Sequence, residues 1–95
     1  MTPPSLVSII IPCYNAERWV FEAVESCLQQ TYKPIEIIVV NDGSTDASVE
    51  RLRAFGDQIL LIDGPNRGAA HARNTALAEA RGEYIQFLDA DDYLL

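Results

Sequence analysis

Two runs of β-branched residues constrain the fold of this chain most strongly. Val7–Ile11 and Ile35–Val40 are almost continuous in valine and isoleucine and show little alternation with polar side chains. Such runs are typical of strands that are buried on both faces of a parallel sheet. Because a strand of this kind needs helices on both sides of its sheet, the chain is expected to be an α/β protein.

The segments around these two runs predict the remaining elements. Pro12 is expected to end the first strand, and Asn15 to cap a helix over Ala16–Gln30, whose apolar residues have helical spacing. The other expected elements are a helix Asp46–Phe55, a strand Ile59–Ile62, a helix Ala69–Arg81 that Gly82 ends at C′, and a strand Glu83–Leu88. This order predicts three α/β/α layers, with a mainly parallel sheet that binds ligands at the carboxyl ends of its strands.

Composition limits the classes of function. The 95 residues are enough for one domain, which we place at 1–95, and 48% hydrophobic residues are ordinary for a globular protein. A net charge of −7 without a basic stripe argues against nucleic acid as a partner. Cys13 and Cys27 are too few for a disulfide scaffold, so thiols and a cytoplasmic location are expected, with membrane association left open for a longer parent protein.

An acidic run follows the last expected strand. Asp89, Asp91 and Asp92 lie within four residues, and three neighbouring carboxylates repel one another unless a cation separates them. Hard divalent cations, Mg²⁺ or Mn²⁺, prefer such oxygen ligands and often carry a substrate phosphate. A solvated loop or a helix cap is the alternative. The metal hypothesis gains support because each polar segment follows a strand, so that all of them are expected along one edge of the sheet.

Several nucleotide-binding devices are missing from the sequence. Neither G-x-G-x-x-G nor G-x-x-x-x-G-K-[ST] occurs, which argues against a dinucleotide fold and a P-loop NTPase. A receiver domain needs its acidic pair after the first strand, where this chain has Pro12-Cys13-Tyr14-Asn15. An aspartyl phosphatase would carry its motif after an early strand rather than after the last one.

Four motifs in order resemble glycosyltransferase family 2. They are Ile-Ile-Pro-Cys-Tyr-Asn15, Val-Val-Asn-Asp-Gly-Ser-Thr-Asp46, Asn66-Arg-Gly-Ala-Ala-His-Ala-Arg-Asn74 and Phe-Leu-Asp-Ala-Asp-Asp92. The resemblance covers the chain from Val7 onward. It implies the GT-A fold, a Rossmann-like nucleotide-diphospho-sugar transferase fold that would be truncated here. It also implies inverting transfer of a sugar from a nucleotide, for which UDP is the expected carrier.

The resemblance also implies roles for individual residues. The nucleotide-binding residues would be Pro12, Tyr14, Asn15, Asp42, Arg73, Asp89 and Ala90, and the metal ligand would be Asp91. Tyr14 would lie against the base, or else pack over the sheet edge. Asp42 would accept a hydrogen bond from the base while also forming a turn. Arg73 would hold a carboxylate or a phosphate, or else be a surface residue.

Further expectations concern what lies beyond the donor. In the family, the general base and the acceptor site come from downstream of the D-x-D motif. The chain is therefore expected to be the N-terminal donor-binding part of a larger enzyme of polysaccharide or cell-wall synthesis, inactive alone, whose acceptor would be a saccharide, a lipid or another molecule. An uncovered sheet edge predicts a homo-oligomer. A non-catalytic nucleotide and metal module, or an Asp-dependent phosphohydrolase, are the alternatives.

Overall fold

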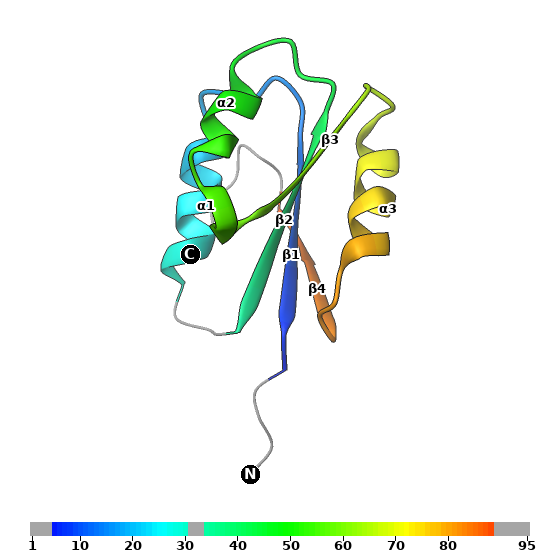
Figure 1. Ribbon diagram of the computed structural model, residues 1–95. Coiled ribbons are helices and arrows are strands. Elements are labelled where there is room, and N and C mark those ends of the chain that lie inside the picture. The colour runs from blue at the N-terminus through cyan, green and yellow to red at the C-terminus, as the bar shows by residue number, and fades with distance from the viewer. Residues whose placement is uncertain (1–4, 31–33, 89–95) are drawn as a thin grey trace.

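The chain forms a four-stranded parallel sheet with helices on both faces (Figure 1). The computed structural model describes residues 5–30 and 34–88. The elements are β1 (Val7–Cys13), α1 (Val20–Gln29), β2 (Ile35–Asp42), α2 (Ser48–Arg53), the 3₁₀ helix η1 (Gly56–Gln58), β3 (Leu60–Gly64), α3 (Ala69–Glu79) and β4 (Tyr84–Phe87). The expected order of strands and helices is confirmed. No helix in these described parts has the length and apolar character that a membrane span requires.

The strand order is β3-β2-β1-β4, and every pair is parallel. β1 and β2 are the inner strands, as their β-branched sequences predict, and β3 and β4 form the two edges. α1 and α2 cover one face, whereas α3 crosses the other face on its way from one edge strand to the other (Figure 1). All four strands consequently have their carboxyl ends at the same end of the sheet, which we call the carboxyl edge.

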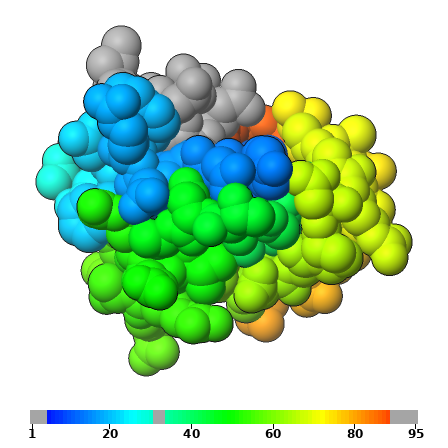
Figure 2. Space-filling model, turned by 90° about the horizontal axis from the view of Figure 1, so that it is seen from above, coloured from blue at the N-terminus to red at the C-terminus, as the bar shows by residue number. Residues whose placement is uncertain are grey.

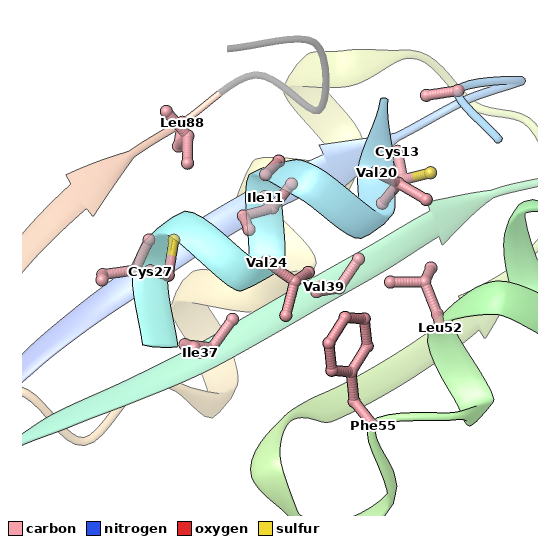
Figure 3. Close-up of a cluster of buried hydrophobic side chains, with 13 residues drawn as sticks. Ile11, Cys13, Val20, Val24, Cys27, Ile37, Val39, Leu52, Phe55 and Leu88 are labelled. Carbon is pink, nitrogen blue, oxygen red and sulfur yellow. The ribbon is translucent and has the colours of Figure 1, made fainter. Parts of the chain in front are cut away.

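Two apolar clusters hold the helices on the sheet. The larger cluster lies under α1 and α2, where Ile11 and Val39 of the sheet meet Val24, Leu52 and the ring of Phe55 (Figure 3). The smaller cluster joins β1 and β2 to α3, whose buried contacts come from alanines alone, Ala72 and Ala76. Alanine lets the helix axis approach the sheet closely, and this brings the start of α3 near the ends of β1 and β2.

The expectation that Pro12 ends the first strand is wrong, because β1 continues to Cys13. Pro12 stands opposite Val40 in the register with β2. The amide of Leu88 donates to the carbonyl of Ile10, so the backbone polar groups of Ile10, and of Pro12 two residues later, face the β4 side. The described pairing with β4 ends at Ile10, and the missing N–H of proline therefore removes no bond to β2.

Helix ends also differ from expectation: α2 is two residues shorter at each end, and the start of α1 and the end of α3 differ for a reason that the structure shows. α1 begins at Val20 rather than Ala16, and Asn15 is not its N-cap but a left-handed residue with φ 48°. α3 ends at Glu79, so Gly82 lies three residues beyond it and not at C′. Asn15 and Gly82 instead make contacts with segments that are distant in the sequence, and local sequence patterns do not show such contacts.

Candidate functional site

A cavity of about 530 Å³ opens at the carboxyl edge of the sheet. It lies among the loop after β1, the end of β2 and the start of α3. Figure 2 looks onto this edge, where the blue, green and yellow segments meet. The lining residues are Pro12, Cys13, Tyr14, Asn15, Ala16, Trp19, Asp42, Asn66, Gly68 and Ala69. The structure therefore brings together four of the predicted site residues: Pro12, Tyr14, Asn15 and Asp42.

Two aromatic side chains are accessible in this cavity. Tyr14 is 52% exposed, so its ring is available to a ligand. Trp19 is 41% exposed and lines the same cavity, although sequence analysis did not identify it. The expected helix over residues 16–30 placed Trp19 on a helical turn, whereas the observed start of α1 at Val20 leaves it at the helix entrance. Aromatic planes of this kind can stack on a nucleotide base or pack against a sugar.

Asn15 fixes the loop that carries Tyr14. Its side-chain oxygen Oδ1 accepts a hydrogen bond from the backbone amide of Thr45 at 2.7 Å, and the backbone amide of Asn15 donates to Oγ of Ser44 at 3.0 Å. These two bonds join the loop after β1 to the loop after β2. Asparagine tolerates the positive φ that this geometry requires. The side chain of Asn15 thus shapes the cavity wall.

Asp46 forms a second connection between the same loops. Its carboxylate accepts from the amide of Glu17 at 3.2 Å and from both the amide and the hydroxyl of Ser48, at 3.0 and 2.6 Å. Ser48 Oγ in turn accepts from the amide of Ala16. Burial alone would raise the pKa of Asp46, but the hydrogen bonds from Ser48 and Glu17 outweigh burial and lower the pKa.

Asp42 holds the start of α3. Its two carboxylate oxygens accept from the amides of Arg67 and Gly68 at 2.7 and 3.0 Å. The first turn of α3 has no acidic residue, so an aspartate from β2 supplies the negative charge that a helix N-terminus favours. Each carboxylate oxygen has two acceptor positions, which leaves Asp42 able to accept a further bond from a ligand in the cavity.

Two glycines shape these loops, one by allowing a close approach and the other by its backbone conformation. A Cβ on Gly43, whose φ is 72°, would lie 2.5 Å from the backbone nitrogen of Asn66. The loop before α3 can therefore reach the end of β2 only because residue 43 has no side chain. Gly68 has φ 94° and no neighbour within 4 Å of a Cβ, so its role is conformational and not a close approach.

Arg73 lies outside the described cavity wall. Its guanidinium carbon is 6.0 Å from the centre of the Phe87 ring, at the end of β4. Phe87 precedes Asp89 by two residues in the sequence. The predicted site residues Asp89 and Ala90 and the predicted metal ligand Asp91 lie outside the described residues. Within residues 5–30 and 34–88, no group of three acidic, histidine or cysteine side chains is placed to hold a metal ion.

Both cysteines are free, as expected, and both are buried. Burial raises the pKa of Cys13, although hydrogen bonds with Ser48, Ala16 and Ser44 oppose this rise. Burial also raises the pKa of Cys27, to about 11. Both thiols are therefore protonated at neutral pH and are poor nucleophiles.

The fold and the cavity define the class to which the chain belongs. A parallel α/β sheet whose ligand cavity lies at the carboxyl ends of its strands is typical of nucleotide-binding domains. The model of glycosyl transferase family 2 matches residues 8–95, and the chain belongs to this family. The fold is that of the nucleotide-diphospho-sugar transferases, as similar solved structures show.

Three relatives illustrate these similarities. The glucosyltransferase WfaP from Escherichia coli, named as a UDP-Glc:alpha-D-GlcNAc-diphosphoundecaprenol beta-1,3-glucosyltransferase, is 49% identical over 90 residues, which cover 93% of this chain and 36% of WfaP. The mannosyltransferase PcManGT from Pyrobaculum calidifontis, solved with GDP-Man and Mn²⁺, has a TM-score of 0.86 and 33% identity over 92% of this chain and 28% of its own. TarS 1-349 from S. aureus, solved with UDP, has a TM-score of 0.85 and 31% identity over the same shares.

The chain is shorter than these relatives. It spans 13% to 37% of the length of the curated relatives that it matches, among them GlyA of Streptococcus pneumoniae and a glycosyltransferase of Haemophilus influenzae.

Proposed function

We propose that this chain binds a nucleoside-diphosphate sugar, with UDP as the favoured nucleotide, together with Mg²⁺ or Mn²⁺. In this proposal it is the donor-binding part of a larger transferase that passes the sugar to an acceptor hydroxyl with inversion. The observation that carries the proposal is the cavity at the carboxyl edge, where the accessible ring of Tyr14 and the carboxylate of Asp42 line one space.

The chemistry of this wall suits a base that has a ring N–H donor, such as uracil. Tyr14 offers a plane on which any base can stack, worth about 1–3 kcal/mol. Asp42 offers only acceptors, and the ring N–H of uracil is a donor. Because the amides of Arg67 and Gly68 already orient the carboxylate, a base that binds there would meet a fixed acceptor.

The charge of the site supports a metal requirement. Asp42 is the single charged residue among the described lining residues, and no lysine or arginine is among them. A diphosphate therefore needs another source of positive charge. The acidic run 89–92 continues from β4, the strand next to β1, and its carboxylates are suitable ligands for a hard divalent cation. Such an ion would stabilise the charge that develops on the departing diphosphate.

The solved relatives agree with this chemistry. PcManGT was solved with GDP-Man and Mn²⁺, and TarS was solved with UDP and with UDP-GlcNAc. These relatives carry different bases and sugars, so they support a nucleotide-sugar donor as a class. The acceptor character of Asp42 suits uracil and guanine, which both have a ring N–H donor, so UDP is the proposed nucleotide because of the family resemblance and not because of this contact alone.

The test uses the single tryptophan of the chain, Trp19, which lines the cavity. We expect UDP to change its fluorescence in the presence of Mn²⁺, and to bind more weakly in EDTA. Tyr14→Ala is expected to weaken binding by about 5- to 150-fold, the equivalent of one lost stacking contact. Tyr84→Ala, which removes an exposed tyrosine of β4 away from the cavity, is the matched control and should bind as the wild type does.

Absence of Mn²⁺-dependent binding of UDP, GDP and ADP to the wild type, by fluorescence and by calorimetry, would refute the proposal. Asp91→Ala adds a second check, because it should abolish the effect of Mn²⁺ while leaving binding in EDTA unchanged. Release of inorganic phosphate that depends on Asp89 would instead favour a phosphohydrolase.

A further inference from the structure

The cavity at the carboxyl edge extends beyond the wall that Tyr14 and Asp42 form. Its volume of about 530 Å³ is in the range that holds a drug-sized ligand, so a base stacked on Tyr14 leaves room for more. On one side lies Asp42, whose carboxylate is bonded to the start of α3, and on the other lie Ala16 and Trp19, which precede α1. Because α3 and α1 cover opposite faces of the sheet, the cavity passes over the end of β1 from one face to the other (Figure 1).

The turn that carries Trp19 is fixed by hydrogen bonds. The backbone amide of Trp19 donates to the carbonyl of Ala16 at 2.9 Å, and the carbonyl of Trp19 accepts from the amide of Ala23 at 3.0 Å. The amide of Ala16 in turn donates at 3.1 Å to Oγ of Ser48, a buried residue of α2. Both backbone groups of Trp19 are therefore held, and its side chain lines the cavity from a rigid support.

Arg18 covers one face of the indole ring of Trp19. The guanidinium carbon of Arg18 lies 5.0 Å from the ring centre, a cation–π contact that favours one orientation of the ring. The side chain of Trp19 is nevertheless 41% exposed and lines the cavity, so a ligand has the other face and the indole N–H available. A broad apolar face with one hydrogen-bond donor suits a sugar ring, whose C–H groups pack on the face while a hydroxyl accepts from the N–H.

We propose that Trp19 is a second aromatic contact of the donor and takes its sugar, while Tyr14 takes its base. A ligand whose base lies between Tyr14 and Asp42, on the α3 side, continues across the end of β1 and meets the indole on the α1 side. The inference rests on the donor binding proposed above and adds which part of the donor each ring contacts. The affinity for a UDP-sugar should therefore depend on Trp19, whereas the affinity for UDP alone should not.

The experiment measures binding of UDP, UDP-glucose and UDP-N-acetylglucosamine by calorimetry in one Mn²⁺ buffer. In Trp19→Ala, the affinity for the UDP-sugars should fall by about tenfold, which corresponds to the loss of roughly 55 Å² of apolar contact. The affinity of this variant for UDP should equal that of the wild type. Trp19→Phe keeps an aromatic face and should retain most of the affinity for the UDP-sugars. In the wild type, the fluorescence of Trp19 should differ between saturating UDP and saturating UDP-sugar.

Phe21→Ala is the matched control. Phe21 is 39% exposed on α1, packs on the ring of Phe55 with 5.0 Å between the ring centres, and lies outside the described wall of the cavity. Its replacement removes a similarly exposed ring two residues from Trp19, so it measures the effect of lost packing near the start of α1. Its affinities for UDP and for the UDP-sugars should equal those of the wild type. Tyr14→Ala should weaken all three ligands by the same factor, because they share one base.

Equal losses for UDP and for the UDP-sugars in Trp19→Ala would overturn the assignment of the sugar to Trp19, and so would unchanged affinity for both UDP-sugars. If Trp19→Ala fails to fold, Trp19→Leu carries the same comparison, because leucine keeps apolar bulk without an aromatic face. A wild type that binds neither UDP nor a UDP-sugar would instead count against the donor binding on which the inference rests.

Discussion

At the scale of single residues, Asp42 combines a structural contact with a predicted binding role. Its carboxylate accepts two backbone amides at the start of α3. Asp42→Asn would turn one of these oxygens into an NH₂ group that faces an N–H donor. We expect a loss of about 1–3 kcal/mol in the free energy of unfolding, measured by urea denaturation. Asp57→Asn, at an exposed residue of η1, should leave that free energy within about 0.5 kcal/mol of the wild type, and equal losses in both variants would contradict this account.

The hydrogen bonds of Asp46 predict how the stability of the fold depends on pH. Its hydrogen bonds from Ser48 and Glu17 lower its pKa below the ordinary value of 3.8. A carboxyl group whose folded pKa is lowered contributes stability above its unfolded pKa, and the contribution is lost as the pH falls through the folded pKa. The wild type should therefore exceed Asp46→Asn in stability by about 1 kcal/mol at pH 6, and this difference should shrink below about pH 4. Thermal unfolding of both proteins from pH 3 to pH 7 measures it, and a difference that grows toward acid would contradict the prediction.

At the scale of elements, the sequence predicted the centres of strands and helices and missed several of their ends. Within the runs Val7–Ile11 and Ile35–Val40, the stretches 8–11 and 37–40 are buried on both faces, which β-branched composition signals directly. Asn15 and Gly82 have local signals for a helix cap and a helix end. The structure uses them instead for contacts with Thr45 and with Ser8, far away in the chain. Local patterns cannot distinguish these uses because the competing partner is distant in sequence.

In the candidate site, too, some residues were predicted from the sequence and others were missed. Strand order alone placed Tyr14 and Asp42 at one edge, and the structure brings both to the same cavity. Trp19 was missed because the expected helix began too early, and Asn66 because a loop residue carries no periodic signal. The one available signal for Trp19 was its type, since an exposed aromatic residue beside a polar loop often contacts ligands. The roles of Arg73, Asp89, Ala90 and Asp91 stay predictions.

At the scale of the whole molecule, the two sheet edges differ in their apolar surface. β4 exposes Tyr84, Ile85 and Phe87, whereas Leu60 is the one large apolar residue of β3 that is markedly exposed. Both are edge strands in the described sheet, and an edge strand offers unpaired backbone groups to another chain. The apolar side chains on β4 would be buried together with those groups, so β4 is the edge at which self-association is expected.

A pair of identical chains joined edge to edge around a two-fold axis would place the two copies of β4 antiparallel, with the same residues on both sides. Ile85→Lys puts a charge into that contact twice and should favour the monomer of 10.5 kDa. Leu60→Lys makes the same change on β3 and should leave the association as it is in the wild type. Sedimentation equilibrium over about a hundredfold range of concentration, centred on the micromolar affinities of weak dimers, measures both effects. Because a charge of −7 on each copy opposes contact, added salt should strengthen the dimer, and a wild type that stays monomeric at high salt would exclude this association.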